Sequence, residues 1–167
     1  MKKIVFVFAI VVSSLPMFSQ TKDVVDIAIS SKDHTTLVAA VKAADLVATL
    51  KGKGPFTVFA PTNAAFGNLP KGTLESLLKP ESKSALAGIL TYHVVAGNLD
   101  AAAVVAAIKK GNGKAVVTTV NGAKLTASLD GKNVILTDAK GGKATVVAAD
   151  LNGTNGVVHV IDAVLLP

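Results

Sequence analysis

The chain has 167 residues, 50% of them apolar and 17% charged, with a formal net charge of +6 and no cysteine. This length and composition fit one globular domain, and they exclude a disulfide framework and a lipid-anchoring cysteine. All 17 basic residues are lysines and only 4% of the chain is aromatic, so the arginine forks and stacking rings that bind nucleic acid are missing. We therefore expect no nucleic-acid partner.

The first 19 residues have the pattern of a secretory signal peptide. Lys2 and Lys3 precede an apolar run over residues 4–15, and small residues follow up to Ser19. The run is shorter than the roughly 20 residues that a membrane-spanning helix needs. We expect cleavage near Ser19, a short segment over residues 20–23, and a secreted or periplasmic domain over residues 24–167 without an integral membrane anchor.

Helical spacing of apolar residues continues from position 21 to position 50, with Asp33 as the expected N-cap of a second helix. Glycines and a proline in residues 51–55 end this part. The stretch 56–66 then changes from a strand to a helix. Its apolar residues occupy both alternating sets of positions, which predicts a strand packed on both faces, and Pro61 ends the strand. Thr62 or Asn63 can cap the short helix that follows.

Residues 73–90 predict two more helices, which lead into Tyr92, His93 and a short strand ending at Gly97. Asp100 is the expected cap of an alanine-rich helix over residues 101–110. Beyond residue 113 the apolar period becomes two, and strands are expected over residues 116–120, 124–129, 133–137 and 145–149, separated by glycine-containing turns. Because no long polar linker interrupts the chain, the sequence predicts one α+β domain.

Three segments in this order resemble the fasciclin-like (FAS1) domain family. Residues 56–66 resemble its first signature, residues 90–97 its tyrosine–histidine segment, and residues 155–167 its second signature. The resemblance covers about residues 24–167 and implies a β-wedge or sandwich of about seven strands with several helices packed along one side. The signature residues, for which we expect a structural role, are Phe56, Thr57, Phe59, Ala60, Pro61, Thr62, Phe66, Asn155, Gly156, His159, Ile161 and Asp162.

One position departs from the family pattern. Related domains often carry glycine where this chain has Asp45. Aspartate tolerates the left-handed backbone conformation better than most residues do. We therefore expect the turn at Asp45 to survive.

The resemblance also suggests a binding segment. In animal members of the family, the corresponding tyrosine and histidine, with their branched neighbours, are implicated in receptor-mediated adhesion. The candidate binding residues here are Leu90, Tyr92, His93, Val94 and Val95. The alternative is that the Tyr92 ring packs locally and its hydroxyl bonds nearby groups, as most tyrosines at a helix-to-strand junction do.

His159 lies between two valines of the expected C-terminal strand, where a buried imidazole needs polar partners. Thr62 and Asp162 are the candidate partners if the two signature segments pack together. We expect His159 to hold these segments together, and Asp162 to cap local backbone groups.

Catalytic and metal-binding motifs are absent from the sequence. No nucleophile-elbow, zinc-protease or phosphate-loop pattern occurs. Residues 150–155 match a calcium loop only at its first and third positions, which favours a hairpin-like loop. The three histidines lie on different expected elements without paired ligand spacing. We therefore expect a non-enzymatic protein with no cofactor and no metal.

The densest basic cluster is Lys109, Lys110 and Lys114, which suits a solvated helix end or a contact with an acidic polymer or surface. The whole sequence predicts a secreted, non-enzymatic cell-adhesion or extracellular-matrix interaction module whose partner is a surface or matrix protein or a polysaccharide. The alternative is a soluble binder of a polysaccharide or a small apolar ligand, in a groove between helices and sheet.

Overall fold

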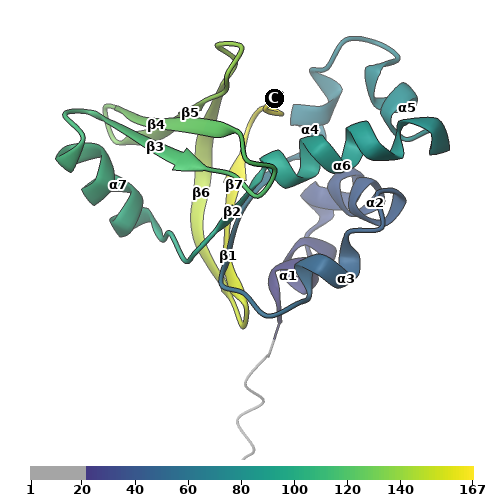
Figure 1. The fold of residues 1–167 in the computed structure, drawn as a ribbon, viewed down its shortest axis with the longest axis horizontal. Helices are drawn as coiled ribbons and strands as arrows, with labels where there is room; N and C mark the ends of the chain where they lie inside the picture. Colours follow the sequence, from purple (N-terminus) through teal and green to yellow (C-terminus); the bar gives the residue numbers. More distant parts are fainter. Residues whose placement is uncertain (1–21) are drawn as a thin grey trace, which may run out of the picture.

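The computed structural model describes residues 22–167, so the expected signal peptide lies outside the described residues. A helical first half is followed by a β-rich second half (Figure 1). The helices are α1 (Val24–Ser30), α2 (Thr35–Ala43), α3 (Val47–Leu50), α4 (Asn63–Gly67), α5 (Thr73–Leu77), α6 (Lys83–Tyr92) and α7 (Ala101–Lys110), with short 3-10 turns at Lys32–His34 and Pro80–Ser82. The strands are β1 (Phe56–Pro61), β2 (Val94–Ala96), β3 (Lys114–Thr118), β4 (Lys124–Asp130), β5 (Asn133–Thr137), β6 (Lys143–Gly153) and β7 (Gly156–Ile161).

All seven strands form one sheet in the order β2-β1-β7-β6-β5-β4-β3. Strands β1 and β7 run parallel, and every other neighbouring pair is antiparallel. A bridge between Val95 and Thr119 links the two ends of the sheet, which is therefore almost closed into a barrel. Helices α1 to α6 lie on one side of the sheet, whereas α7 packs on the other side against β3 and β4 (Figure 1). The predicted α+β fold of about seven strands is confirmed, with α7 as the helix that lies apart.

Strand β1 separates two hydrophobic cores because its side chains alternate between its two faces. Val58 and Ala60 belong to the core beneath the helices α1 to α6. Phe59 points the other way, into a core enclosed by the curved sheet and α7. Both faces are buried, as the sequence pattern predicts.

Side-chain caps begin two helices where the sequence predicts them. The Thr62 hydroxyl accepts from the Ala65 N–H at 3.2 Å at the start of α4, and the Asp100 carboxylate accepts from the Ala103 N–H at 2.7 Å at the start of α7. Each bond satisfies a backbone donor that the first turn of a helix leaves unpaired.

The prediction that Asp33 caps the second helix is wrong, because a 3-10 turn at Lys32–His34 precedes α2 and contains Asp33. His34 occupies the N-cap position of α2 without a capping bond from its side chain. Asn63, the first residue of α4, supplies the missing acceptor, since its Oδ1 accepts from the Thr36 N–H at 2.9 Å. A residue distant in sequence therefore caps α2.

Two positive φ angles fall on aspartates. Asp45 has φ of 60°, so the expected left-handed turn is present. Asp150 also has φ of 60° and lies in β6, where the pairing with β7 shifts register twice. The predicted loop over residues 150–155 is wrong in extent, because β6 continues to Gly153 and only Thr154 and Asn155 form the turn. The bulged region interrupts the period-two pattern that marks a strand in a sequence.

Candidate functional site

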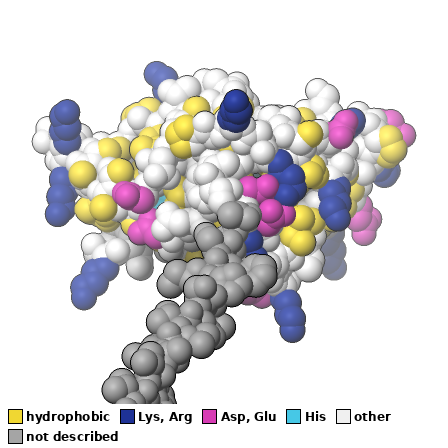
Figure 2. All heavy atoms as spheres, turned by 90° about the horizontal axis from the view of Figure 1, so that it is seen from below, with side chains coloured by type: hydrophobic (Ala, Val, Ile, Leu, Met, Phe, Trp, Pro, Cys, Tyr) yellow, Lys and Arg dark blue, Asp and Glu magenta, His cyan; other side chains and the backbone are white. Residues whose placement is uncertain are grey.

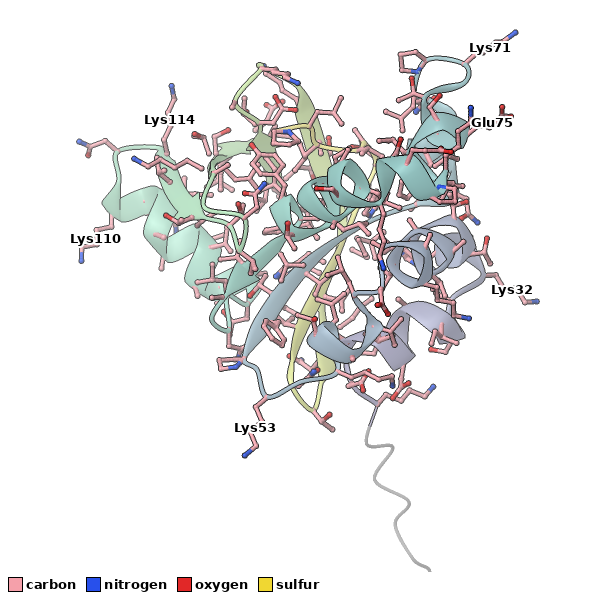
Figure 3. The ribbon with its side chains drawn as sticks, turned by 45° about the vertical axis from the view of Figure 1, so that its right-hand side comes forward. Lys32, Lys53, Lys71, Glu75, Lys110 and Lys114 are labelled. Carbon is pink, nitrogen blue, oxygen red and sulfur yellow. The ribbon has the colours of Figure 1, made fainter. Side chains whose placement is uncertain are left out.

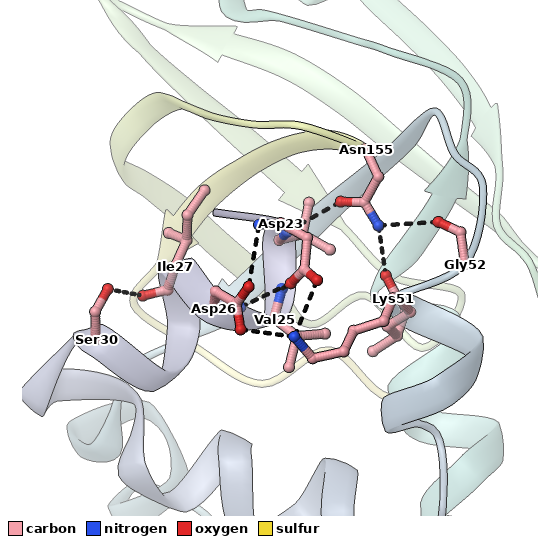
Figure 4. A network of polar contacts seen from close by, with 10 residues as sticks. Asp23, Val25, Asp26, Ile27, Ser30, Lys51, Gly52 and Asn155 are labelled. Carbon is pink, nitrogen blue, oxygen red and sulfur yellow. Dashed lines mark hydrogen bonds and ion pairs between the residues drawn. The ribbon is translucent and has the colours of Figure 1, made fainter. Parts of the chain in front are cut away.

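The start of α1 is held by a junction of charged side chains (Figure 4). The Asp23 carboxylate accepts from the backbone N–H groups of Val25 and Asp26, each at 2.9 Å. The Lys51 ammonium contacts Asp23 at 3.0 Å and Asp26 at 2.6 Å. The hydrogen bond from Lys51 lowers the pKa of Asp26, and the same bond raises the pKa of Lys51. The junction fixes α1 to the end of α3.

Asn155, a residue of the second signature, adds a third segment to this junction. Its Oδ1 accepts from the Val24 N–H at 3.0 Å, and its Nδ2 donates to the carbonyl oxygens of Leu50 at 2.8 Å and Gly52 at 3.1 Å (Figure 4). One amide therefore joins the β6–β7 turn to the beginning of α1 and the end of α3. These contacts are structural, as we expect for a signature residue.

An apolar cleft lies beside this junction, between α1, α2, α3 and α6, with β1 beneath. The space within it that admits the centre of a water molecule is about 40 Å³. Its lining is apolar except for one lysine and one histidine, and consists of Val24, Val25, Ala28, Ile29, Leu37, Val38, Val41, Lys42, Val47, Leu50, Val58, Leu90, His93 and Val94. Most of this lining also belongs to the hydrophobic core beneath helices α1 to α6.

The histidine of the cleft has both ring nitrogens engaged by backbone groups. His93 Nε2 accepts from the Leu165 N–H at 3.0 Å, so the ring proton is on Nδ1, which donates to the Ile89 carbonyl at 2.8 Å. Burial lowers the pKa of His93 to about 4. The imidazole is therefore neutral near pH 7 and offers no free polar atom to the cleft.

The five candidate binding residues are all buried in this conformation. Tyr92 is 0% exposed, and its hydroxyl donates to the Lys124 carbonyl at 3.0 Å and accepts from the Ala139 N–H at 3.2 Å. Burial raises the pKa of Tyr92. These contacts are those of the local-packing alternative, and the five side chains have little exposed surface in this conformation. A binding role for Leu90, Tyr92, His93, Val94 and Val95 stays a prediction.

The two signature segments do lie side by side, since β1 and β7 pair in register and Phe59 faces His159. Their rings stack with centroids 5.7 Å apart. The predicted polar partners of His159 are wrong: its Nδ1 accepts from the Asp150 N–H at 3.3 Å and its Nε2 donates to the Leu99 carbonyl at 2.7 Å. The reason is that the imidazole reaches the irregular part of β6 and the loop before α7.

The two residues that were expected to bond His159 are engaged elsewhere. Thr62 caps α4, and the Asp162 carboxylate accepts from the Thr145 N–H on β6 at 2.7 Å. Asp162 therefore joins β6 to the end of β7, and the prediction of a local cap is wrong. Thr62 follows the end of β1 and Asp162 follows the end of β7, whereas His159 pairs with Phe59 inside the two strands.

Substitution His159→Phe is expected to lower the free energy of unfolding by about 2 kcal/mol, because the Asp150 N–H and the Leu99 carbonyl lose their partner while the ring stack remains. Urea denaturation measures the change. Val147→Phe is the matched control, since Val147 lies on β6 and is 58% exposed. An unchanged midpoint for His159→Phe would show that these two bonds contribute nothing.

The lysines are spread over the surface. Lys32, Lys53, Lys71, Lys110 and Lys114 extend outward from different elements (Figure 3), and the face seen in Figure 2 shows basic side chains scattered among apolar and acidic ones. Lys109 and Lys110 stand in the last turn of α7, as the solvated-end alternative requires. Across the described part of the chain, no group of three or more His, Cys, Asp or Glu side chains is placed to hold a metal ion, and no helix is long and apolar enough to span a bilayer.

Sequence reasoning missed several residues that organise the site. The spacing of Asp23 and Asp26 fits a capping box, which could have revealed the start of α1. Nothing in the sequence marks Lys51 as their partner. Asp138, which accepts from the Gly142 and Leu166 N–H groups at 2.7 and 3.1 Å, gave no signal either.

Comparisons with known proteins agree with this fold. The fasciclin domain model matches residues 32–167. Protein sll1483 of Synechocystis is 52% identical over 145 residues, covering 86% of this chain and 73% of that protein, and immunogenic protein MPB70 of Mycobacterium bovis is 39% identical over 88% of this chain and 70% of its own length. A FAS1 domain pair from the insect cell adhesion molecule fasciclin I superposes with a TM-score of 0.63 and 25% identity, over 78% of this chain and 43% of that chain. The chain therefore belongs to the fasciclin domain family.

Proposed function

We propose that this protein is a secreted or periplasmic, non-enzymatic adhesion or matrix-interaction module. The observation that carries the proposal is the match of nearly the whole domain to the fasciclin family, which includes the insect cell adhesion molecule fasciclin I. The signal-peptide pattern of residues 1–19 supports a location outside the cytoplasm. His93 and His159 are each bonded by backbone groups, which supports a structural use of these imidazoles over catalysis.

The contact surface that we propose is basic. The segment around Tyr92 is buried, so the partner must meet other residues. Lys109, Lys110 and Lys114 lie together where α7 turns into β3, and all three are exposed. Residues 22–167 contain ion pairs only for Lys51 and Lys83, so the three lysines remain available for an acidic surface protein or polysaccharide.

A surface-attachment assay tests this proposal. A deletion strain of the producing organism is expected to attach less than the parent, and the complementing gene restores attachment. Complementation with the three substitutions Lys109→Glu, Lys110→Glu and Lys114→Glu is expected to fail. The matched control carries the same charge change at Lys32, Lys53 and Lys71, which extend from other parts of the molecule (Figure 3). Equal attachment of the deletion and complemented strains would contradict the proposed function.

The apolar cleft favours a second candidate, a soluble binder of a small apolar ligand. Its lining holds twelve aliphatic side chains and no unsatisfied polar group of His93. For this second candidate, a polysaccharide stacked on aromatic rings fits less well, because the rings of Phe59, Phe66 and Tyr92 are buried. Thermal-shift screening separates the two candidates, since a saturable shift with small apolar compounds supports the binder.

A further inference from the structure

We infer that the apolar cleft binds a small amphiphile with an anionic head group, of the class of medium-chain carboxylates, with its chain between α1 and α2 and its head beside Lys42. This inference rests on the second candidate function and names its ligand class. It does not depend on adhesion.

The shape of the cleft follows from two short helices that present matching stripes. Helix α1 contributes Val24, Val25, Ala28 and Ile29 to the lining. Helix α2 contributes four residues with the same spacing, Leu37, Val38, Val41 and Lys42. Such spacing places side chains on one helix face. In this conformation the cleft admits the centre of a water molecule over only about 40 Å³, well below the range of about 300–1000 Å³ that small-molecule sites occupy, so a bound alkyl chain needs α1 and α2 to move apart.

The interior of the cleft has no polar group that needs water as a hydrogen-bond partner. The walls are aliphatic, and both nitrogens of His93 are bonded to the backbone of Ile89 and Leu165. An alkyl chain can therefore enter without leaving a buried polar group unpaired, and it gains the free energy of leaving water.

Lys42 is the reason why we assign an anionic head group to the ligand. It lines the cleft and is exposed, in the last turn of α2. The nearby Asp45 pairs with Lys83 at 3.5 Å, and within residues 22–167 no carboxylate forms an ion pair with Lys42. A lysine whose stem follows an apolar wall and whose ammonium reaches solvent suits an anionic head at the mouth.

Helix α1 provides a way in. Its polar anchors, Asp23, Asp26 and the Asn155 amide, all hold its first turn. At its other end Ile29 is 51% exposed, and the Ser30 hydroxyl donates to the Ile27 carbonyl of the same helix. The residues that follow are held, since Ser31 bonds His34 at 2.8 Å and Asn63 donates to the Lys32 carbonyl at 3.0 Å, so the displacement concerns only the last turn of α1. A small outward displacement of this end enlarges the cleft without breaking the junction shown in Figure 4.

Isothermal titration calorimetry of the purified protein with octanoate, decanoate and dodecanoate, each below its micelle concentration, tests the inference. Affinity is expected to rise roughly fourfold for each added methylene until the cleft is full. Decanoate is expected to bind more tightly than decanol, and decanol more tightly than decyltrimethylammonium. Absence of saturable binding would overturn the inference, and equal affinity for the three head groups would overturn the anionic class while leaving an apolar binder.

Two pairs of variants locate the site. Lys42→Glu is expected to weaken decanoate binding roughly tenfold and leave decanol unchanged, whereas Lys79→Glu, an exposed lysine outside the cleft, changes neither. Ala28→Trp fills the cleft and is expected to abolish binding of both compounds, whereas Ala39→Trp on the exposed face of α2 does not. Circular dichroism checks that each variant is folded. Decanoate binding that survives Ala28→Trp in a folded protein would overturn the assignment.

Discussion

Replacing Gly156 with alanine is expected to lower the free energy of unfolding by about 3 kcal/mol or more. A Cβ on Gly156 would lie within the contact radius of the Phe56 carbonyl oxygen, which belongs to the backbone of β1. Neither strand can yield, because β1 is paired with β2 on its other edge and β7 is paired with β6. The parallel pairing must therefore open at this point.

Urea denaturation measures the loss, and Gly88→Ala is the matched control. Gly88 lies inside α6, and a Cβ there meets nothing within 4 Å. The control is expected to raise stability by up to about 1 kcal/mol, because alanine is the better helix former. If Gly156→Ala unfolds at the same urea concentration as the parent, the β1 and β7 backbones do not approach as closely at Gly156 as we describe.

Lowering the pH from 7 to 4 is expected to reduce the free energy of unfolding by about 3 kcal/mol through His93 alone. The pKa of His93 is about 4 in the folded protein, against 6.5 as its ordinary value. Below pH 6.5 the unfolded chain binds a proton that the folded chain does not, so stability falls by about 1.4 kcal/mol per pH unit and levels off below pH 4. Burial also lowers the pKa of His34, which adds to the loss in the same direction.

Two measurements check this prediction. Urea unfolding from pH 7 to pH 4 gives the slope, and His34→Phe is expected to keep most of it because the His93 contribution remains. Imidazole nitrogen shifts in NMR spectra are expected to show His93 neutral, with its proton on Nδ1, down to about pH 5. Titration of His93 near pH 6.5 in the folded protein would contradict the burial that we assign to it.

Features encoded by adjacent residues were predictable from the sequence. The Thr62 and Asp100 caps depend on groups three residues away, and the hairpin at Gly131 depends on a left-handed glycine between two alternating strands. Resemblance to the fasciclin family supplied what local pattern does not, the expectation that residues 56–66 and 155–167 belong together. The in-register pairing of β1 with β7 confirms it.

Features set by contacts across the chain were not predictable. Lys51 meets Asp23 only because α3 ends beside the start of α1, and His159 meets Leu99 only because β7 passes the loop before α7. The position of α7 on the far side of the sheet likewise depends on the almost closed curvature of the sheet. The residues of the apolar cleft read in the sequence as ordinary core positions, and most of them do pack in the core beneath helices α1 to α6.

The place of β7 in the sheet has a consequence for biogenesis. Phe56 pairs with Gly156, about 100 residues further along, and β7 is the strand between β1 and β6. Without it β1 and β6 lose their shared neighbour, and each strand has a bare edge that invites aggregation and proteolysis. The chain therefore cannot complete its fold until β7 has been synthesised, and copies truncated before β7 keep exposed strand edges that quality control can recognise.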